Sequence, residues 1–146
     1  MLAPREPEVH VDEQVASGFD QVVGLEVVSA DGDRVSGRLP VAPHLHQPYG
    51  IVHGGVYATV VETTASVGAA LWFADRSGGS GHVVGVSNHT NFLRAVRAGV
   101  LDVEATPVHR GRTQQLWQVS VTDEQGRLVA RGEVRLANIR PEAIGG

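Results

Sequence analysis

The chain has 146 residues, a net charge of −4 and no cysteine. Its length fits one domain, and its acidic balance provides no basic surface for nucleic acid. The lack of cysteine excludes disulfides and thiolate chemistry. The acidic, polar N-terminus is unlike a signal peptide, so we expect a cytoplasmic protein.

The chain divides into one predicted domain and two tails. Residues 1–17 are interpreted as an N-terminal tail, with a short helix near 11–19 leading into the fold. Residues 18–140 form the predicted domain, and residues 141–146 form a C-terminal tail.

Six strands and one long helix are predicted within this domain. Two strands come first, and the helix follows and ends near Ala74, before a flexible loop at Asp75–Gly81. The order β-β-α-β-β-β-β predicts an α+β fold with one antiparallel sheet and one helix. In the last strand, every second residue from Leu128 to Leu136 is expected to face the core. The predicted strands are Leu25–Ser29, Arg34–Val41, Val83–Leu93, Val100–Val108, Thr113–Thr122 and Leu128–Ala137.

The run from Val56 to Ala74 is apolar nearly all round, which is typical of a buried helix. Its length, roughly 30 Å as a helix, is too great for one strand. Its threonines and serine make it too polar to span a membrane. Glu62 is the only residue in the run that carries a charge at neutral pH. A buried carboxylate is costly unless it is paired, protonated or used, so Glu62 either meets solvent or a salt bridge, or is functional.

The loop before this helix carries groups that can hold negative charge. His53-Gly54-Gly55 places small residues at a helix N-terminus, where free N–H groups and the helix dipole favour an oxyanion. Gln47, just upstream, has an amide that can donate to a carbonyl oxygen. An oxyanion site beside a lone carboxylate suits the transfer of an acyl group to water.

These residues resemble a known family. The pattern of Gln47-Pro48-Tyr49-Gly50, His53-Gly54-Gly55 and Glu62 is similar to the loop and central helix of hotdog-fold acyl-CoA thioesterases. The nearest branch resembles the 4-hydroxybenzoyl-CoA thioesterases, with the PaaI-like phenylacetate-pathway thioesterases and 1,4-dihydroxy-2-naphthoyl-CoA hydrolase. The resemblance extends from about residue 18 to residue 139. It implies that the sheet wraps round the helix.

The resemblance also implies roles around the thioester. Glu62 is the expected nucleophile or the general base for water, and both mechanisms stay open. Gln47 and the Gly54 N–H are expected to polarise the carbonyl oxygen. His53 is interpreted either as a helix cap or as a substrate contact. Ser66, one turn after Glu62, either holds the carboxylate or the water, or bonds its own helix backbone.

A second group of residues is expected to bind coenzyme A. The segment His109–Gln114 matches the family's His-x-Gly nucleotide-binding turn, although a solvated hairpin turn is the alternative. Arg94 matches a second such position. Phe92 stands where some naphthoyl-CoA hydrolases carry a histidine, which argues against that substrate. The expected coenzyme A-binding residues are Gly85, Phe92, Leu93, Arg94, Ala95, His109, Arg110, Gly111, Arg112, Thr113 and Gln114.

The sequence therefore predicts a thioester hydrolase that converts an acyl- or aroyl-CoA to the free acid and coenzyme A without a metal or other cofactor. In the resembling family the site lies between subunits, which implies a homodimer or homotetramer. No nucleic acid or membrane partner is expected. The alternatives are a non-catalytic acyl-CoA-binding hotdog protein, which usually carries a DNA-binding segment, and a hotdog acyl hydratase or dehydratase, whose histidine motif we do not find.

Overall fold

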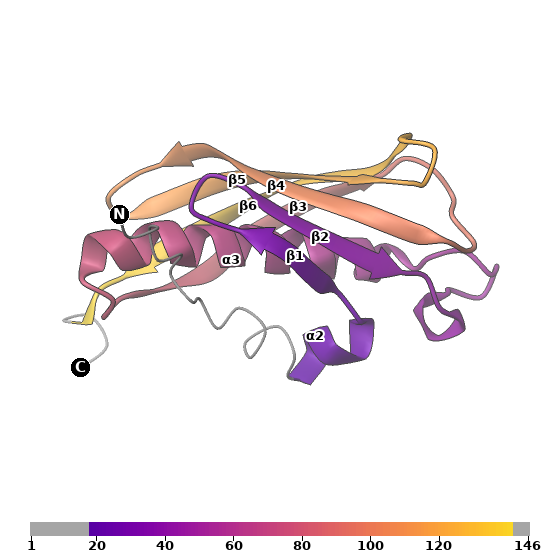
Figure 1. The fold of residues 1–146 in the computed structure, drawn as a ribbon, viewed down its shortest axis with the longest axis horizontal. Coiled ribbons are helices and arrows are strands. Elements are labelled where there is room, and N and C mark those ends of the chain that lie inside the picture. Colours follow the sequence, from indigo (N-terminus) through magenta and orange to yellow (C-terminus); the bar gives the residue numbers. More distant parts are fainter. Residues whose placement is uncertain (1–17, 142–146) are drawn as a thin grey trace, which may run out of the picture.

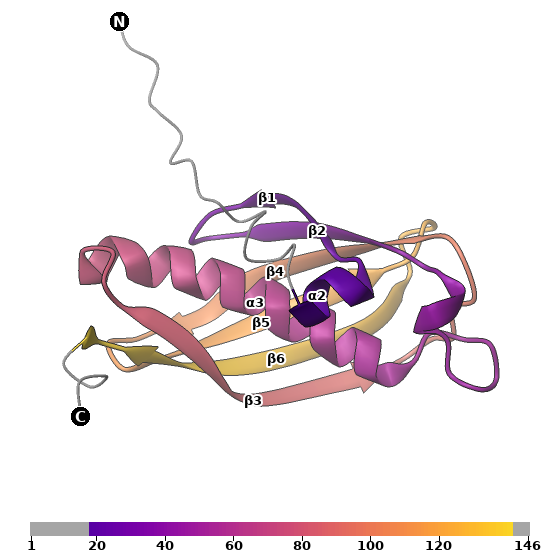
Figure 2. The ribbon, with the colours of Figure 1, turned by 90° about the horizontal axis from the view of Figure 1, so that it is seen from below.

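The computed structural model describes residues 18–141, which form one sheet with one long helix against it (Figure 1). The helix, α3 (Gly54–Ser77), lies along one face of the sheet, and the sheet curves over it. A short helix, α2 (Gly18–Val23), lies on the side of α3 that faces away from the sheet (Figure 2). The expected α+β class, with one antiparallel sheet wrapped around a central helix, is confirmed.

The sheet has six strands in the order β1-β2-β4-β5-β6-β3, and each neighbouring pair is antiparallel. Strands β1 and β3 therefore form its two edges. All six expected strands are present, within one or two residues of their predicted ends. They are β1 (Glu26–Ala30), β2 (Val35–Pro40), β3 (His82–Phe92), β4 (Val100–Arg110), β5 (Gln114–Thr122) and β6 (Leu128–Ile139).

Helix α3 begins at Gly54, where the His53-Gly54-Gly55 step was expected to place a helix N-terminus, and it is longer than expected at its C-terminal end. His53 caps it, because the Gly55 N–H donates to His53 Nδ1 at 2.8 Å. It ends at Ser77 rather than near Ala74, where Gly78 takes a left-handed conformation with a φ of 68°. The first three residues of the loop expected at 75–81 are thus helical.

Two expected segments lie mainly outside the described residues. Of the short helix predicted near 11–19, only the last two residues are described, and they open α2, which continues to Val23. Of the predicted C-terminal tail, only Pro141 is described. The loop after β2 contains a single turn of 3-10 helix, η1 (Pro43–Leu45).

The core lies between α3 and the sheet. The alternating apolar residues of β2, β4 and β5 face it as expected. On β6 the expectation for Leu128 is wrong: Leu128 is 38% exposed and Val129 is buried instead. A bulge explains the change, because Thr122 pairs with Leu128 while Val121 pairs with Ala130, which leaves Val129 as an extra residue. Helix α3 could cross a membrane by length and composition alone, yet 56% of its apolar window is buried as a core helix.

One close contact sets how near α3 approaches the sheet. A Cβ at Gly68 would lie 2.6 Å from Trp117 Cη2 and Cζ3 and 3.0 Å from Val35 Cγ2. The Trp117 indole is fully buried and donates to Gln115 Oε1 at 2.8 Å, and Gln115 Nε2 donates to the Ala69 carbonyl at 3.1 Å. The Trp117 indole ring thus occupies the space that a side chain at position 68 would take, and it fixes the helix on β5.

Replacing Gly68 by Ala tests this contact. Overpacking a buried site costs about 1–3 kcal/mol, whereas Ala gains up to about 1 kcal/mol in helix propensity over Gly. We expect a net loss of ~1–2 kcal/mol in the free energy of unfolding, measured by urea denaturation. In a Trp117→Phe background the smaller ring leaves room, so Gly68→Ala should cost less there. A stabilised single variant would contradict the assigned contact.

Candidate active site

The N-terminus of α3 forms one side of a pocket of about 310 Å³. It combines the two expected carbonyl-polarising residues with four of the expected coenzyme A-binding residues, which lie at and just after the end of β3. The lining residues are Gln47, Ile51, Val52, Gly54, Tyr57, Phe92, Leu93, Arg94 and Ala95. The structure therefore brings together residues that lie almost 50 positions apart in the sequence.

Gln47 is held by its own loop in a fixed orientation. Its backbone N–H donates to the Ile51 carbonyl at 2.8 Å, and its side-chain Oε1 accepts from the Tyr49 N–H. Because a backbone N–H needs an oxygen acceptor, this bond places the Oε1 and leaves Nε2 as the outward donor. Within residues 18–141, neither Gln47 Nε2 nor the Gly54 N–H has a hydrogen-bond acceptor. Both donors are therefore available to a ligand.

Two aromatic side chains line the same pocket. The Phe92 ring lies against Gly54, since a Cβ on Gly54 would be 2.7 Å from Phe92 Cζ. The ring centroids of Tyr57 and Phe92 are 6.1 Å apart. The Tyr57 hydroxyl is buried and has no hydrogen-bond partner in the described part of the chain. Burial raises the pKa of Tyr57 to about 12, so the phenol remains a neutral donor at physiological pH.

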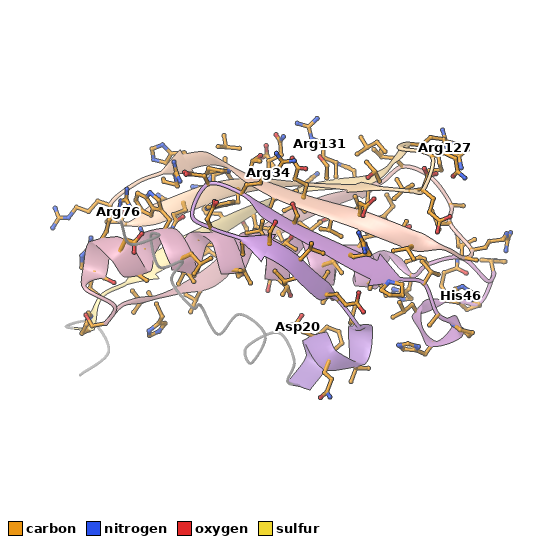
Figure 3. The ribbon with its side chains drawn as sticks, in the orientation of Figure 1. Asp20, Arg34, His46, Arg76, Arg127 and Arg131 are labelled. Carbon is orange, nitrogen blue, oxygen red and sulfur yellow. The ribbon has the colours of Figure 1, made fainter. Side chains whose placement is uncertain are left out.

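Glu62 lies in a different pocket on the same helix. It is eight residues after Gly54, which corresponds to about 12 Å along the helix axis. Its pocket, of about 280 Å³, is lined by Phe19, Asp20, Ala58, Thr59, Glu62, Thr63 and Asn88. The Asp20 carboxylate accepts from Thr63 Oγ1 at 2.6 Å, which ties α2 to α3 beside the pocket. Figure 3 shows Asp20 on α2, on the far side of α3 from the sheet.

The Glu62 carboxylate lies against β3. A Cβ at Gly85 would be 3.4 Å from the Glu62 carboxyl carbon, and Asn88 Nδ2 donates to Glu62 Oε1 at 3.5 Å. Gly85 therefore lies beside the carboxylate, and its expected place in the coenzyme A groove stays a prediction. Within residues 18–141, no salt bridge involves Glu62.

The Glu62 side chain is exposed in the single chain, which agrees with the interpretation that it meets solvent and leaves its catalytic role a prediction. The reason is topological: the carboxylate faces β3, and β3 is an edge strand. Within residues 18–141, no strand pairs with the free edge of β3.

Ser66 and His53 are the other two residues predicted at the catalytic site. Ser66 is half-buried one turn after Glu62, and no hydrogen bond joins the two among the described residues. His53 acts as the cap of α3 through Nδ1, which agrees with one of its two interpretations and leaves Nε2 exposed.

The turn at His109–Gln114 lies at the opposite end of α3 from Arg94. The Arg110 guanidinium is 5.6 Å from the ring centroid of Trp72, a residue about 27 Å along the helix from Gly54. Arg110 Nη1 also donates to the Gly32 carbonyl and, at 2.7 Å, to Asp33 Oδ1. Within one chain, the two segments expected to bind coenzyme A are thus far apart, and one of their arginines is already engaged.

Sequence reasoning did not identify Asn88 or Asp20 as neighbours of Glu62. A signal exists for Asn88, because a polar residue stands in β3 at a position that faces the core. Asp20 gives no signal, since only the placement of α2 brings it to Thr63. Among residues 18–141, no group of three or more His, Asp or Glu side chains is arranged to hold a metal ion.

A helix-borne carboxylate and unused donors at the N-terminus of the same helix, under a curved antiparallel sheet, are features of a thioesterase. The family described as the Thioesterase superfamily matches residues 49–130, more than half of the chain. The protein therefore belongs to the Thioesterase superfamily, and it is a thioester hydrolase of the hotdog fold.

Relatives agree with this assignment. A Mycobacterium tuberculosis protein named as an esterase, Rv1847, is 46% identical over 121 residues, covering 83% of this chain and 86% of that protein. The 1,4-dihydroxy-2-naphthoyl-CoA hydrolase of Listeria monocytogenes is 31% identical over 120 residues, with coverage of 82% and 94%. The crystal structure of the thioesterase HI1161 from Haemophilus influenzae superposes with a TM-score of 0.82 at 28% identity, covering 89% of this chain and 88% of that one.

The unpaired Tyr57 hydroxyl yields a prediction about stability. Because a buried unpaired hydroxyl is costly, Tyr57→Phe is expected to keep or raise the free energy of unfolding at pH 7, by up to about 1 kcal/mol. Above pH 10 the unfolded tyrosine ionises while the folded one, with a pKa of about 12, does not, so wild-type stability should fall between pH 10 and 12. Tyr57→Phe should lessen this alkaline loss.

Urea denaturation at pH 7 and pH 11 measures both effects. Tyr49→Phe is the control, because Tyr49 is 83% exposed and its hydroxyl remains in water. A clear destabilisation by Tyr57→Phe at pH 7 would show that the hydroxyl has a structural partner.

Proposed function

We propose that this protein hydrolyses an acyl- or aroyl-CoA thioester in the cytoplasm, with Glu62 as its catalytic carboxylate. The products are the free acid and coenzyme A, and water is the only co-substrate, so no cofactor is required. One observation carries the proposal: helix α3 and the loop before it hold both a carboxylate without a salt bridge and two unused hydrogen-bond donors. The two donors are Gln47 Nε2 and the Gly54 N–H.

The chemistry follows from these groups. Gln47 Nε2 and the Gly54 N–H donate to the thioester oxygen and stabilise the negative charge that develops there. Glu62 attacks the carbonyl carbon and forms a mixed anhydride, which water then hydrolyses, or it removes a proton from the attacking water. In both cases the carbon–sulfur bond breaks, and the sulfur of coenzyme A leaves as a thiolate that takes up a proton.

The site is completed, in this proposal, by a second copy of the chain. Donors and carboxylate must each come within about 3 Å of one thioester group, whereas about 12 Å of helix separates Gly54 from Glu62 within one chain. Glu62 of one subunit therefore works with Gln47 and Gly54 of another, as in the resembling family. The free edge at β3 supports this assembly, because its Val84 and Val86 are 45% and 62% exposed. A homodimer is the smallest assembly that satisfies this requirement, and a homotetramer contains two of them.

The pocket at the helix N-terminus supports an aromatic-tolerant acyl site. Phe92 and Tyr57 line it together with the proposed carbonyl donors. The name of the Listeria relative, a hydrolase of a naphthoyl-CoA, supports the same substrate class. Arg94, on the rim of this pocket and outside every salt bridge of the described residues, is the better candidate for a coenzyme A phosphate. Arg110 is less suited, because Asp33 already holds its guanidinium.

Glu62→Gln tests the catalytic assignment. The substitution keeps the shape of the side chain and removes its charge, so it removes both the nucleophile and the base. We expect kcat for acyl-CoA hydrolysis, followed by thiol release on a panel of acyl-CoAs, to fall at least about 100-fold. Circular dichroism and thermal unfolding should match the wild type. Turnover near the wild-type rate would contradict the catalytic role assigned to Glu62.

Mixing two inactive variants tests the shared site. Glu62→Ala chains and Gln47→Ala chains are each expected to be inactive alone. In a mixed dimer, one site collects both lesions and the other regains the wild-type set, so activity should return after subunit exchange. Native mass spectrometry of the mixture confirms that exchange has occurred. Exchanged dimers without activity, or a fully active monomer, would show that each site belongs to one chain.

A further inference from the structure

Two polar side chains occupy core-facing positions on β3. In the antiparallel pairing with β6, Asn88 lies opposite Val134 and Thr90 lies opposite Gly132. Directly opposite residues share a face of the sheet, and Val134 is fully buried on the face covered by α3. Asparagine is a poor strand former, and a polar group on a buried face is costly unless it is hydrogen-bonded. The presence of these two polar side chains on a buried face therefore needs an explanation.

Both polar side chains are hydrogen-bonded, which offsets the cost of placing them on this face. Thr90 Oγ1 donates to Asn88 Oδ1 at 2.6 Å, which fixes the amide with its oxygen toward Thr90 and its nitrogen toward α3. Asn88 Nδ2 then donates to the Ala58 carbonyl at 2.9 Å and to Glu62 Oε1 at 3.5 Å. Gly132 makes room for this arrangement, because a Cβ there would lie 2.6 Å from Thr90 Oγ1.

The two acceptors of the Asn88 amide belong to one turn of α3. Ala58 and Glu62 are four residues apart, so the Ala58 carbonyl lies at the start of the turn that carries the Glu62 side chain. Asn88 thus fastens β3 to this turn through one N–H and reaches the carboxylate with the other. On the same strand, a Cβ at Gly85 would be only 3.4 Å from the carboxylate carbon, which limits the space open to the Glu62 side chain.

We propose that Asn88 is a positioning residue for Glu62, and that Thr90 acts through Asn88 by fixing the direction of its amide. The proposal rests on the catalytic role of Glu62 argued above. An exposed glutamate side chain samples many rotamers, and holding Oε1 leaves Oε2 directed at the reacting atoms. The 3.5 Å contact is long in the free chain, and catalytic hydrogen bonds of this length tighten when substrate binds.

Asn88→Leu is the main test, because it keeps the size of the side chain and removes both donors. We expect kcat for acyl-CoA hydrolysis to fall about tenfold, with KM within about twofold of the wild type, since the substrate itself loses no contact. Thr90→Val should lower kcat in the same direction by a smaller factor. Asn91→Ala is the matched control: Asn91 pairs with Arg131, which points away from α3 in Figure 3, and its substitution should leave kcat unchanged.

A double-mutant cycle separates positioning from a general effect on the fold. In a Glu62→Asp background the shortened carboxylate lies out of reach of Asn88, so Asn88→Leu should add little to the loss already present. Thermal unfolding identifies a variant that fails to fold, and Asn88→Ser, which is smaller and polar, then replaces it. A wild-type kcat in Asn88→Leu, a raised KM with unchanged kcat, or fully additive losses in the cycle would each overturn the proposal. Glu62→Gln distinguishes the failures: if it stays active, the proposed function is wrong, whereas an inactive Glu62→Gln beside a normal Asn88→Leu refutes only the role of Asn88.

Discussion

The fixed rise of one straight helix determines how this protein can arrange a catalytic site. Helix α3 carries free N–H donors at its first turn and a carboxylate two turns later, and its backbone hydrogen bonds keep the two about 12 Å apart. The Trp117 ring against Gly68 and the Gln115 bond to Ala69 also fix the helix on the sheet, so both groups keep their places relative to the strands. A single chain therefore presents two groups of residues that do not meet, and this separation along one helix is the geometric basis of the proposed shared site.

Some polar groups of the core and the candidate site have hydrogen-bond partners within the described chain, and others do not. Those without a partner lie at the proposed active site. Buried Gln115 and Thr64 are satisfied within the core, and half-buried Asn88 and Thr90 are satisfied by each other and by α3. Gln47 Nε2, the Gly54 N–H and the Tyr57 hydroxyl have no partner among residues 18–141, and all three belong to residues that line one pocket. Because folding rarely leaves a buried donor unpaired, the Tyr57 hydroxyl beside two open donors supports a ligand site at this pocket.

Much of the fold is visible in the sequence, because alternation and turn residues report local preferences that the sheet obeys. The errors have identifiable causes. The end of α3 was placed near Ala74 because the polar residues that follow were assigned to a flexible loop, whereas the helix continues to Ser77 and ends at a left-handed Gly78. Solvent exposure of Glu62 was one of two interpretations of the sequence, and periodicity could not decide between them, since it shows that a helix faces a sheet but not that the strand beside one residue is an edge. Asn88 was missed because its partners on α3 lie 26 to 30 positions earlier in the chain.

The exposure of Glu62 has a consequence for where reactivity arises. In the lone chain its carboxylate is hydrated, and a hydrated carboxylate is a weak nucleophile and base because water competes for its charge. In the proposed dimer, a second copy at the β3 edge removes that water and, in the same step, brings the Gln47 and Gly54 donors to the thioester. The electrostatic interactions among these groups also strengthen as the site loses water. Under this proposal assembly and activation are one event, so the sheet edge that would be a liability on a monomer is the condition for catalysis.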